Sequence, residues 1–181
     1  MGLEKAGDKT TAWAESTLAA YPLMKATDLL IESSFLQRSI SYEVAALSQK
    51  AQEILEKNNP NLKQVHITFS NGGYVLREAL KQLPPEYRDT IIVITTGTTA
   101  IIDADAAHKV YNIIGKKDWP SIECNGGKKG IAKAREKAII RLIPQKQVDP
   151  VIGGHYFMQS DYQIEVNDVV SEDICVSYEI Y

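Results

Sequence analysis

Cysteine is scarce in this 181-residue chain. The two cysteines, Cys124 and Cys175, lie far apart, and neither belongs to a Cys-x-x-Cys pair or a Cys/His cluster. A disulfide framework or a structural zinc site needs several such ligands at short spacing. The sequence therefore predicts reduced thiols, no metal site and a cytoplasmic protein.

Long apolar runs and cofactor signatures are also missing. The longest strongly apolar run, Ile91 to Ile94, is far shorter than the roughly 20 residues that cross a bilayer. Charged residues occupy the N-terminus, where a signal peptide has its apolar segment. Neither a Walker Gly-Lys-Ser/Thr motif nor Gly-x-Gly-x-x-Gly occurs. We therefore expect no membrane span and no cofactor.

Positive charge is not in excess, since 20 Lys and Arg face 23 Asp and Glu for a net charge of -3. Nucleic-acid binding normally requires a basic surface, so we expect no nucleic-acid partner. One stretch is locally basic, with Lys128, Lys129, Lys133, Arg135, Lys137 and Arg141. A solvated helix face explains it best, and an anion site at the start of that helix is the alternative.

The first third of the chain has the pattern of helices. Residues 1–60 predict helices with breaks at Tyr21-Pro22 and Arg38-Ser39. In the clearest element, Ser41 can cap the start and Asn58-Asn59-Pro60 ends it. Apolar residues recur there at intervals of three and four, as in an amphipathic helix.

After residue 60, apolar runs alternate with helical segments. The predicted strands are QVHITF, TIIVITTG, VYNIIG and AIIRLIP, and the predicted helices between them are GYVLREALKQL and GIAKAREKA. This alternation predicts an α/β fold with three layers, a mainly parallel sheet between flanking helices. The apolarity of IIVI and AIIRLI favours burial on both faces.

We expect a single α/β domain over residues 1–181. It would comprise a helical region over 1–60, a core over 61–166, and a tail strand over 167–181. QIEV and ICVSYEIY are further strand candidates, at an edge of the sheet.

The segment HITFSNGGYVL places Ser70 at an abrupt corner between a strand and a helix. A nucleophilic serine occupies such a corner in the pattern Gly-x-Ser-x-Gly. Here Gly72 supplies the second glycine and Thr68 replaces the first. The alternative is a serine that only caps the helix.

A serine nucleophile needs an imidazole base and an orienting carboxylate. The chain has three histidines. His66 lies inside a strand and His108 precedes one, whereas His155 follows the AIIRLIP strand and lies on the same edge as Ser70.

Among the acids, Asp118 follows the VYNIIG strand and is the best placed. Asp103 and Asp105 fit solvent-facing caps, and Asp149 lies in a loop close to His155 in sequence. Ser70, Asp118 and His155 thus each follow a predicted strand, in chain order.

This order resembles the α/β-hydrolase superfamily, as an N-terminally abbreviated member. The blocks that carry the resemblance are HITFSNGGYVLREALKQLPPEYRDTIIVITTGTTAIID, VYNIIGKKDWP and GGHYFMQSDYQ. More narrowly, they are similar to hydrolase-like proteins of chlamydia-related bacteria, over about residues 41–166.

The resemblance implies that Ser70 is the nucleophile, Asp118 the orienting acid and His155 the base, with the backbone N–H of Asn71 as one oxyanion donor. The implied reaction is hydrolysis of a small-molecule ester or thioester. Relatives have smaller or polar residues in place of Thr68 and Phe69, so we expect crowding at this corner.

In the superfamily, a strand before the nucleophile supplies a second oxyanion donor, and residues 1–60 predict no such strand. An inactive hydrolase-like remnant or an interaction module is therefore the alternative function, and an anion-binding module at Ser70–Gly73 is a third. The same absence leaves residues 65–69 at an apolar sheet edge, which favours cover by the N-terminal helices or pairing with a second copy.

Overall fold

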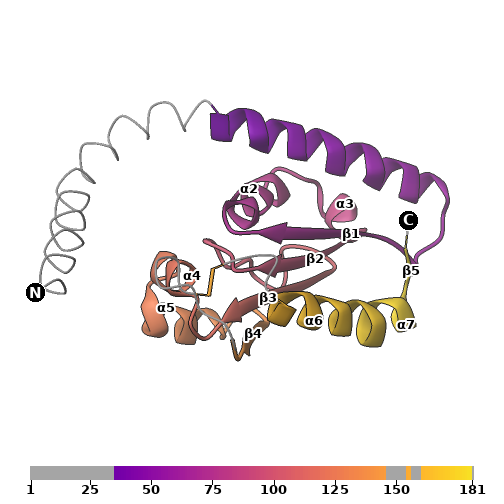
Figure 1. Ribbon diagram of the computed structural model, residues 1–181. Coiled ribbons are helices and arrows are strands. Elements are labelled where there is room, and N and C mark those ends of the chain that lie inside the picture. Colours follow the sequence, from indigo (N-terminus) through magenta and orange to yellow (C-terminus); the bar gives the residue numbers. More distant parts are fainter. Residues whose placement is uncertain (1–34, 146–153, 156–159, 181) are drawn as a thin grey trace, which may run out of the picture. The chain divides into compact units, whose positions relative to one another are not determined.

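A computed structural model describes residues 35–145, 154–155 and 160–180 (Figure 1). The chain divides into two compact units, Met1–Ser39 and Ile40–Tyr181. The sheet and the candidate site lie in the second unit. Whether the whole chain forms one domain stays a prediction.

The second unit is built on a sheet of five parallel strands. They are β1 (Leu62–Phe69), β2 (Ile91–Thr96), β3 (Lys109–Gly115), β4 (Ile140–Ile143) and β5 (Glu179–Ile180). Their order across the sheet is β4-β3-β2-β1-β5. Because all strands run the same way, the residues that follow β1, β2, β3 and β4 meet at one rim.

Helices connect or follow these strands. They are α2 (Asn71–Leu80), α3 (Pro85–Arg88), α4 (Trp119–Cys124), α5 (Gly127–Ala134), α6 (Ser160–Asp168), the π-helix η1 (Val169–Ile174) and α7 (Cys175–Ser177). Figure 1 shows α2 and α3 on one side of the sheet and α6 and α7 on the other. In the part of the chain that is described, no helix is both long and apolar enough to cross a bilayer.

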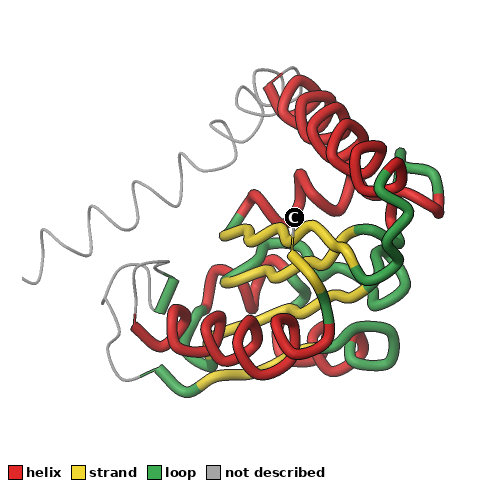
Figure 2. The backbone as a smooth tube through the Cα atoms, turned by 90° about the vertical axis from the view of Figure 1, so that its right-hand side faces the viewer, coloured by secondary structure: helices red, strands yellow, loops and turns green. Residues whose placement is uncertain are grey.

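Each face of the sheet has its own apolar core. The first joins helix residues Ile40 and Leu47 to α2 and to one face of β2; its members include Leu76, Leu80, Ile91 and Val93. The second joins the opposite face to α6 and η1; its members include Ile92, Ile94, Ile113, Tyr162 and Val169. The strands therefore lie between two helical layers (Figure 2), which confirms the predicted three-layer α/β fold.

The predicted helix before β1 is present, but its predicted start is wrong. Residues 35–56 form one continuous helix. The segment around Arg38 and Ser39 contains no proline or glycine that would break a helix, and Ser41 lies inside the helix instead of capping it. The predicted break at Tyr21-Pro22 lies outside the described residues.

The predicted strand QIEV is wrong, because residues 160–168 form α6. The residues of this segment that pack against the core recur with helical spacing, at Tyr162, Val166 and Val169, whereas Ile164 is exposed. Of the predicted tail strand, only Glu179 and Ile180 are extended, and they pair with Leu62 and Lys63 at the edge of the sheet. The helical spacing of the residues that pack inward, and not the β-branched residues, determined that this segment is a helix.

The prediction of two buried faces holds for β2 and fails for β4. All six residues of β2 are buried. Only Ile143 is buried in β4, because this strand lies at the edge of the sheet and Arg141 forms an ion pair with Glu165 on its surface. Cys124 and Cys175 are both free and exposed.

The outer edge of β1 is only partly covered. Gln64 and Ser70 donate their N–H groups to Thr90 and Thr96. Since backbone groups alternate along a strand, the N–H groups of His66 and Thr68 also point to β2 and that of Ile67 points away. Within the described residues, β5 pairs only with Leu62 and Lys63, and the Ile67 side chain is 45% exposed.

The backbone N–H of Ile67 should therefore exchange with solvent faster than those of His66 and Thr68. Amide hydrogen exchange followed by NMR at low protein concentration tests this. Protection of Ile67 that rises with protein concentration would show instead that a second copy pairs with this edge, which is one of the two outcomes that the sequence predicts.

Candidate functional site

Ser70 occupies a strained corner between β1 and α2. Its backbone has φ 54° and ψ -122°, a positive φ that is unusual for a residue with a side chain. The corner is held by Ser70 N–H, which donates to the Thr96 carbonyl, and by Thr99 N–H, which donates to the Ser70 carbonyl. The side chain makes no capping hydrogen bond to α2. The capping interpretation of Ser70 is therefore wrong.

Gly72 makes the corner possible. A Cβ atom at this position would lie 3.3 Å from Cβ of Thr68, so the strand and the first turn of α2 pack almost without space between them. Thr68 does not block the corner, but its buried hydroxyl has no hydrogen-bond partner. The expected crowding is thus real at Thr68 and is accommodated by the glycine.

The Ser70 hydroxyl faces His155. Nε2 of His155 lies 2.9 Å from Oγ of Ser70, and Nδ1 lies 2.9 Å from Oδ1 of Asp118. A carboxylate only accepts hydrogen bonds, so Nδ1 carries the ring proton and Nε2 accepts from the serine hydroxyl. The Phe69 ring packs against the imidazole with 4.8 Å between the centroids. Phe69 therefore supports the histidine.

Asp118 is fully buried and accepts four hydrogen bonds. Oδ1 accepts from His155 and from the Ser121 N–H at 3.1 Å, and Oδ2 accepts from the Ser121 hydroxyl at 2.9 Å and from the Tyr162 hydroxyl at 2.5 Å. Burial alone would raise the pKa of Asp118, but the hydrogen bonds from His155, Tyr162 and Ser121 outweigh it and lower the pKa below its usual value. The carboxylate is thus held as an anion.

Gln145 ties the loop of the acid to the loop of the histidine. Its buried side chain accepts from the Lys117 N–H at 3.0 Å and donates to the Gly154 carbonyl at 2.6 Å. Gly154 N–H in turn donates to the Lys117 carbonyl. A Cβ atom at Gly115 or Gly154 would lie 2.2 or 2.1 Å from Gln145 atoms. Both glycines therefore make room for the carboxamide that fixes the residue before His155.

The other candidate side chains lie elsewhere. His66 bonds to Gln64 inside the sheet, and burial lowers its pKa. His108 bonds to Asp89 at the opposite end of the strands. Asp103 and Asp105 are exposed, as expected for solvent-facing residues, and Asp149 lies outside the described residues.

The basic stretch around α5 is a solvated surface. Its cationic side chains at positions 128, 129, 133, 135 and 137 are exposed, as the sequence predicts. Among the described residues, no group of three or more His, Cys, Asp or Glu side chains could hold a metal ion.

Asn71 begins α2 directly after the serine. The first N–H groups of a helix have no helical partner four residues before them, and in α2 the Gly73 N–H donates to the Ser70 carbonyl. The backbone of Asn71 is therefore placed to donate to a negative oxygen beside Ser70. From residue 35 onward, no strand precedes β1, so the described chain does not supply a second donor from such a strand.

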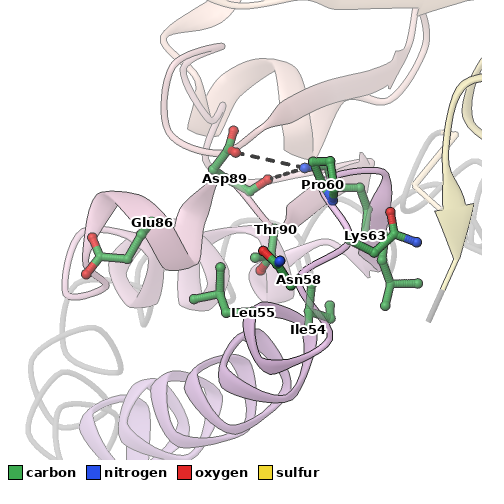
Figure 3. A pocket seen from close by; sticks show the side chains of 10 residues that line it. Ile54, Leu55, Asn58, Pro60, Lys63, Glu86, Asp89 and Thr90 are labelled. Carbon is green, nitrogen blue, oxygen red and sulfur yellow. Dashed lines mark hydrogen bonds and ion pairs between the residues drawn. The ribbon is translucent and has the colours of Figure 1, made fainter.

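A cavity of about 310 Å³ lies at the other end of the strands. Its lining includes Ile54, Leu55, Lys63, Asp89 and Thr90 (Figure 3). The Lys63 ammonium group is buried there and donates to the Asp89 carbonyl at 2.9 Å. The Lys63 ammonium group therefore already has a hydrogen-bond partner in the protein, and it lies far from the rim where Ser70 lies.

Comparison of the chain with protein families, with curated proteins and with solved structures gives no match. The geometry of the rim is therefore the basis for any functional conclusion.

The sequence predicted the three central side chains and missed those that hold them. Ser121 could have been found from its position three residues after Asp118, where a capping partner is common. Tyr162 carries no local signal for its hydroxyl contacts, because Gly115 and Asp118 lie far before it in the chain. Gln145 carries no local signal, because its partners come from two separate loops.

Gly97 is the residue where crowding around the acid is tightest. It has φ 52°, and a Cβ atom there would lie 2.8 Å from the Phe69 ring and 2.9 Å from Oδ2 of Asp118. Gly97→Ala should lower the free energy of unfolding by the cost of a positive φ, about 1–2 kcal/mol, plus about 1–3 kcal/mol for overpacking.

The control is Gly127→Ala, because Gly127 has φ 68° and open space around it. Gly127→Ala should lower the free energy of unfolding only by the cost of the positive φ. Denaturant unfolding measures the free energy of unfolding of both variants. An equal loss of stability in the two variants would contradict the crowding at Gly97.

Asp118 should make stability depend on pH. Because its pKa in the folded protein is below the usual value of 3.8, the ionised form stabilises the fold above that pH, and the stabilisation is lost as pH falls through the lowered pKa. Asp118→Asn should therefore destabilise by about 3 kcal/mol at pH 7, and the difference from the wild type should narrow below about pH 4.

Urea unfolding at several pH values tests this. The exposed Asp103→Asn serves as the control and should change stability by less than about 0.5 kcal/mol. A difference between Asp118→Asn and the wild type that stays constant from pH 7 to pH 3 would be inconsistent with an ionised, hydrogen-bonded Asp118.

Proposed function

We propose that this protein is a serine hydrolase that cleaves an ester or thioester with Ser70, His155 and Asp118. The proposal depends on one observation above all. Ser70 is held at a positive φ, its side chain makes no capping hydrogen bond to its own helix, and its hydroxyl bonds to a histidine that bonds in turn to a buried carboxylate. A serine needs this chain of contacts to become a nucleophile at neutral pH.

In the first half of the reaction, Oγ of Ser70 attacks the carbonyl carbon and its proton passes to Nε2 of His155. Asp118 keeps the proton on Nδ1 and stabilises the imidazolium that forms. The carbonyl oxygen becomes negative, and the backbone N–H of Asn71 donates to it. His155 then gives its proton to the departing alcohol or thiol, which leaves an acyl group on Ser70.

In the second half, His155 takes a proton from a water molecule as that water attacks the acyl carbon. Collapse of the second tetrahedral intermediate returns the proton to Ser70 and releases the acid. No redox step or external cofactor is needed. With the Asn71 N–H as the oxyanion donor that the described residues supply, turnover is expected to be about 100- to 1000-fold lower than with two donors.

The arrangement also agrees with the resemblance to the α/β-hydrolase superfamily. Ser70, Asp118 and His155 follow β1, β3 and β4 in chain order, and all three strands end at one rim. The resemblance is a proposal that the site geometry supports.

A fluorophosphonate probe tests the reaction, because it modifies only an activated serine hydroxyl. The wild type should be labelled at Ser70, as identified by peptide mass spectrometry. Ser70→Ala should abolish labelling, and His155→Ala should slow it by about 10⁴-fold or more.

Ser171→Ala is the matched control, since the Ser171 hydroxyl bonds to the Asn167 carbonyl on the surface. It should label like the wild type. Equal labelling of the wild type and Ser70→Ala would refute the proposal, and a folded wild type that resists the probe would favour an interaction module instead.

A further inference from the structure

Tyr162 connects the acid to the end of a strand. Its ring is fully buried between α6 and the sheet. Its hydroxyl donates to Oδ2 of Asp118 at 2.5 Å and accepts from the Gly115 N–H at 2.9 Å. The same oxygen therefore contacts the last residue of β3 and the carboxylate three residues later.

The contacts of Asp118 divide between its two oxygens. Oδ1 faces His155, and Oδ2 is held by the hydroxyls of Ser121 and Tyr162. Rotation of an aspartate carboxylate about its last bond is otherwise broad. Ser121 lies on the same short helix that Asp118 begins. Tyr162 is therefore the contact that fixes the carboxylate relative to α6 and to the rest of the sheet.

We infer that Tyr162 is a positioning residue, which fixes the Asp118 carboxylate in the orientation that presents Oδ1 to His155. The inference rests on the proposed function. Tyr162 acts through Asp118, and no contact joins its hydroxyl to Ser70 among the described interactions. Its contribution would therefore be to the alignment of His155, not to a proton transfer of its own.

The electrostatics are consistent with this role. Burial raises the pKa of Tyr162, and the Asp118 charge and the hydrogen bond to it raise this pKa further. The phenol thus stays protonated as a donor while Asp118 stays ionised. Among the described residues, the titratable groups in contact with the Asp118 carboxylate are His155, from the loop after β4, and Tyr162, from α6.

The experiment compares Tyr162→Phe with Tyr111→Phe. Tyr111 is a matched control because it is also buried and its hydroxyl donates to an aspartate, Asp173, away from the rim. Both variants lose a buried tyrosine hydroxyl. Two quantities are measured on each folded variant: the rate of fluorophosphonate labelling of Ser70, and the pKa of Asp118 from the ¹³C NMR shift of its carboxyl carbon.

Tyr162→Phe should slow labelling about tenfold, the factor expected for loss of one hydrogen bond to a charged group, and should raise the pKa of Asp118. Tyr111→Phe should change neither quantity. An unchanged Asp118 pKa in Tyr162→Phe would overturn the inference, and so would an equal slowing of labelling in the two variants.

A second replacement guards against misfolding. 3-Fluorotyrosine at position 162 keeps the hydroxyl, and its more acidic phenol should lower the pKa of Asp118 further; a change in the opposite direction would overturn the inference. If the wild type is not labelled at all, the proposed hydrolase function fails. The NMR measurement still decides whether Tyr162 fixes the carboxylate.

Discussion

The arrangement of the rim depends on one buried charge. Asp118 lies out of contact with water, and an ionised carboxylate in such a place is unfavourable unless hydrogen bonds replace its hydration. Four donors do so, from the start of α4, from α6 and from the loop after β4. Each of these segments is therefore held relative to the others by the same two oxygens, and His155 is placed by the same contacts that make Asp118 stable.

Close packing allows these loops to approach one another. Gly97 leaves space for the Phe69 ring and Asp118, and Gly115 and Gly154 leave space for the Gln145 carboxamide. A side chain at any of the three would displace an atom of the rim or the group that holds it. These glycines mainly allow side chains to approach the backbone closely. Only Gly97 among them has a positive φ, so a turn is not the main reason for glycine at these positions.

The carboxyl ends of four strands are enough to build this site. β1 presents the serine, β2 ends at Gly97, β3 leads to the acid, and β4 leads to Gln145 and the histidine. The strand order β4-β3-β2-β1 brings them together, and from residue 35 onward no strand before β1 takes part. The outer edge of β1 stays partly open at Ile67, because β5 pairs with only the first two residues of β1.

Local pattern in the sequence determined the alternation of strands and helices, the parallel sheet, and the choice of Ser70, Asp118 and His155 as side chains at strand ends. These features follow from hydrophobic period and from the rule that parallel strands end at one rim. The tertiary structure alone decided that residues 160–168 are helical, that β4 is a partly buried edge strand, and that Tyr162, Ser121 and Gln145 hold the site. Those outcomes depend on which surfaces meet across long separations in the chain, and no local window contains that information.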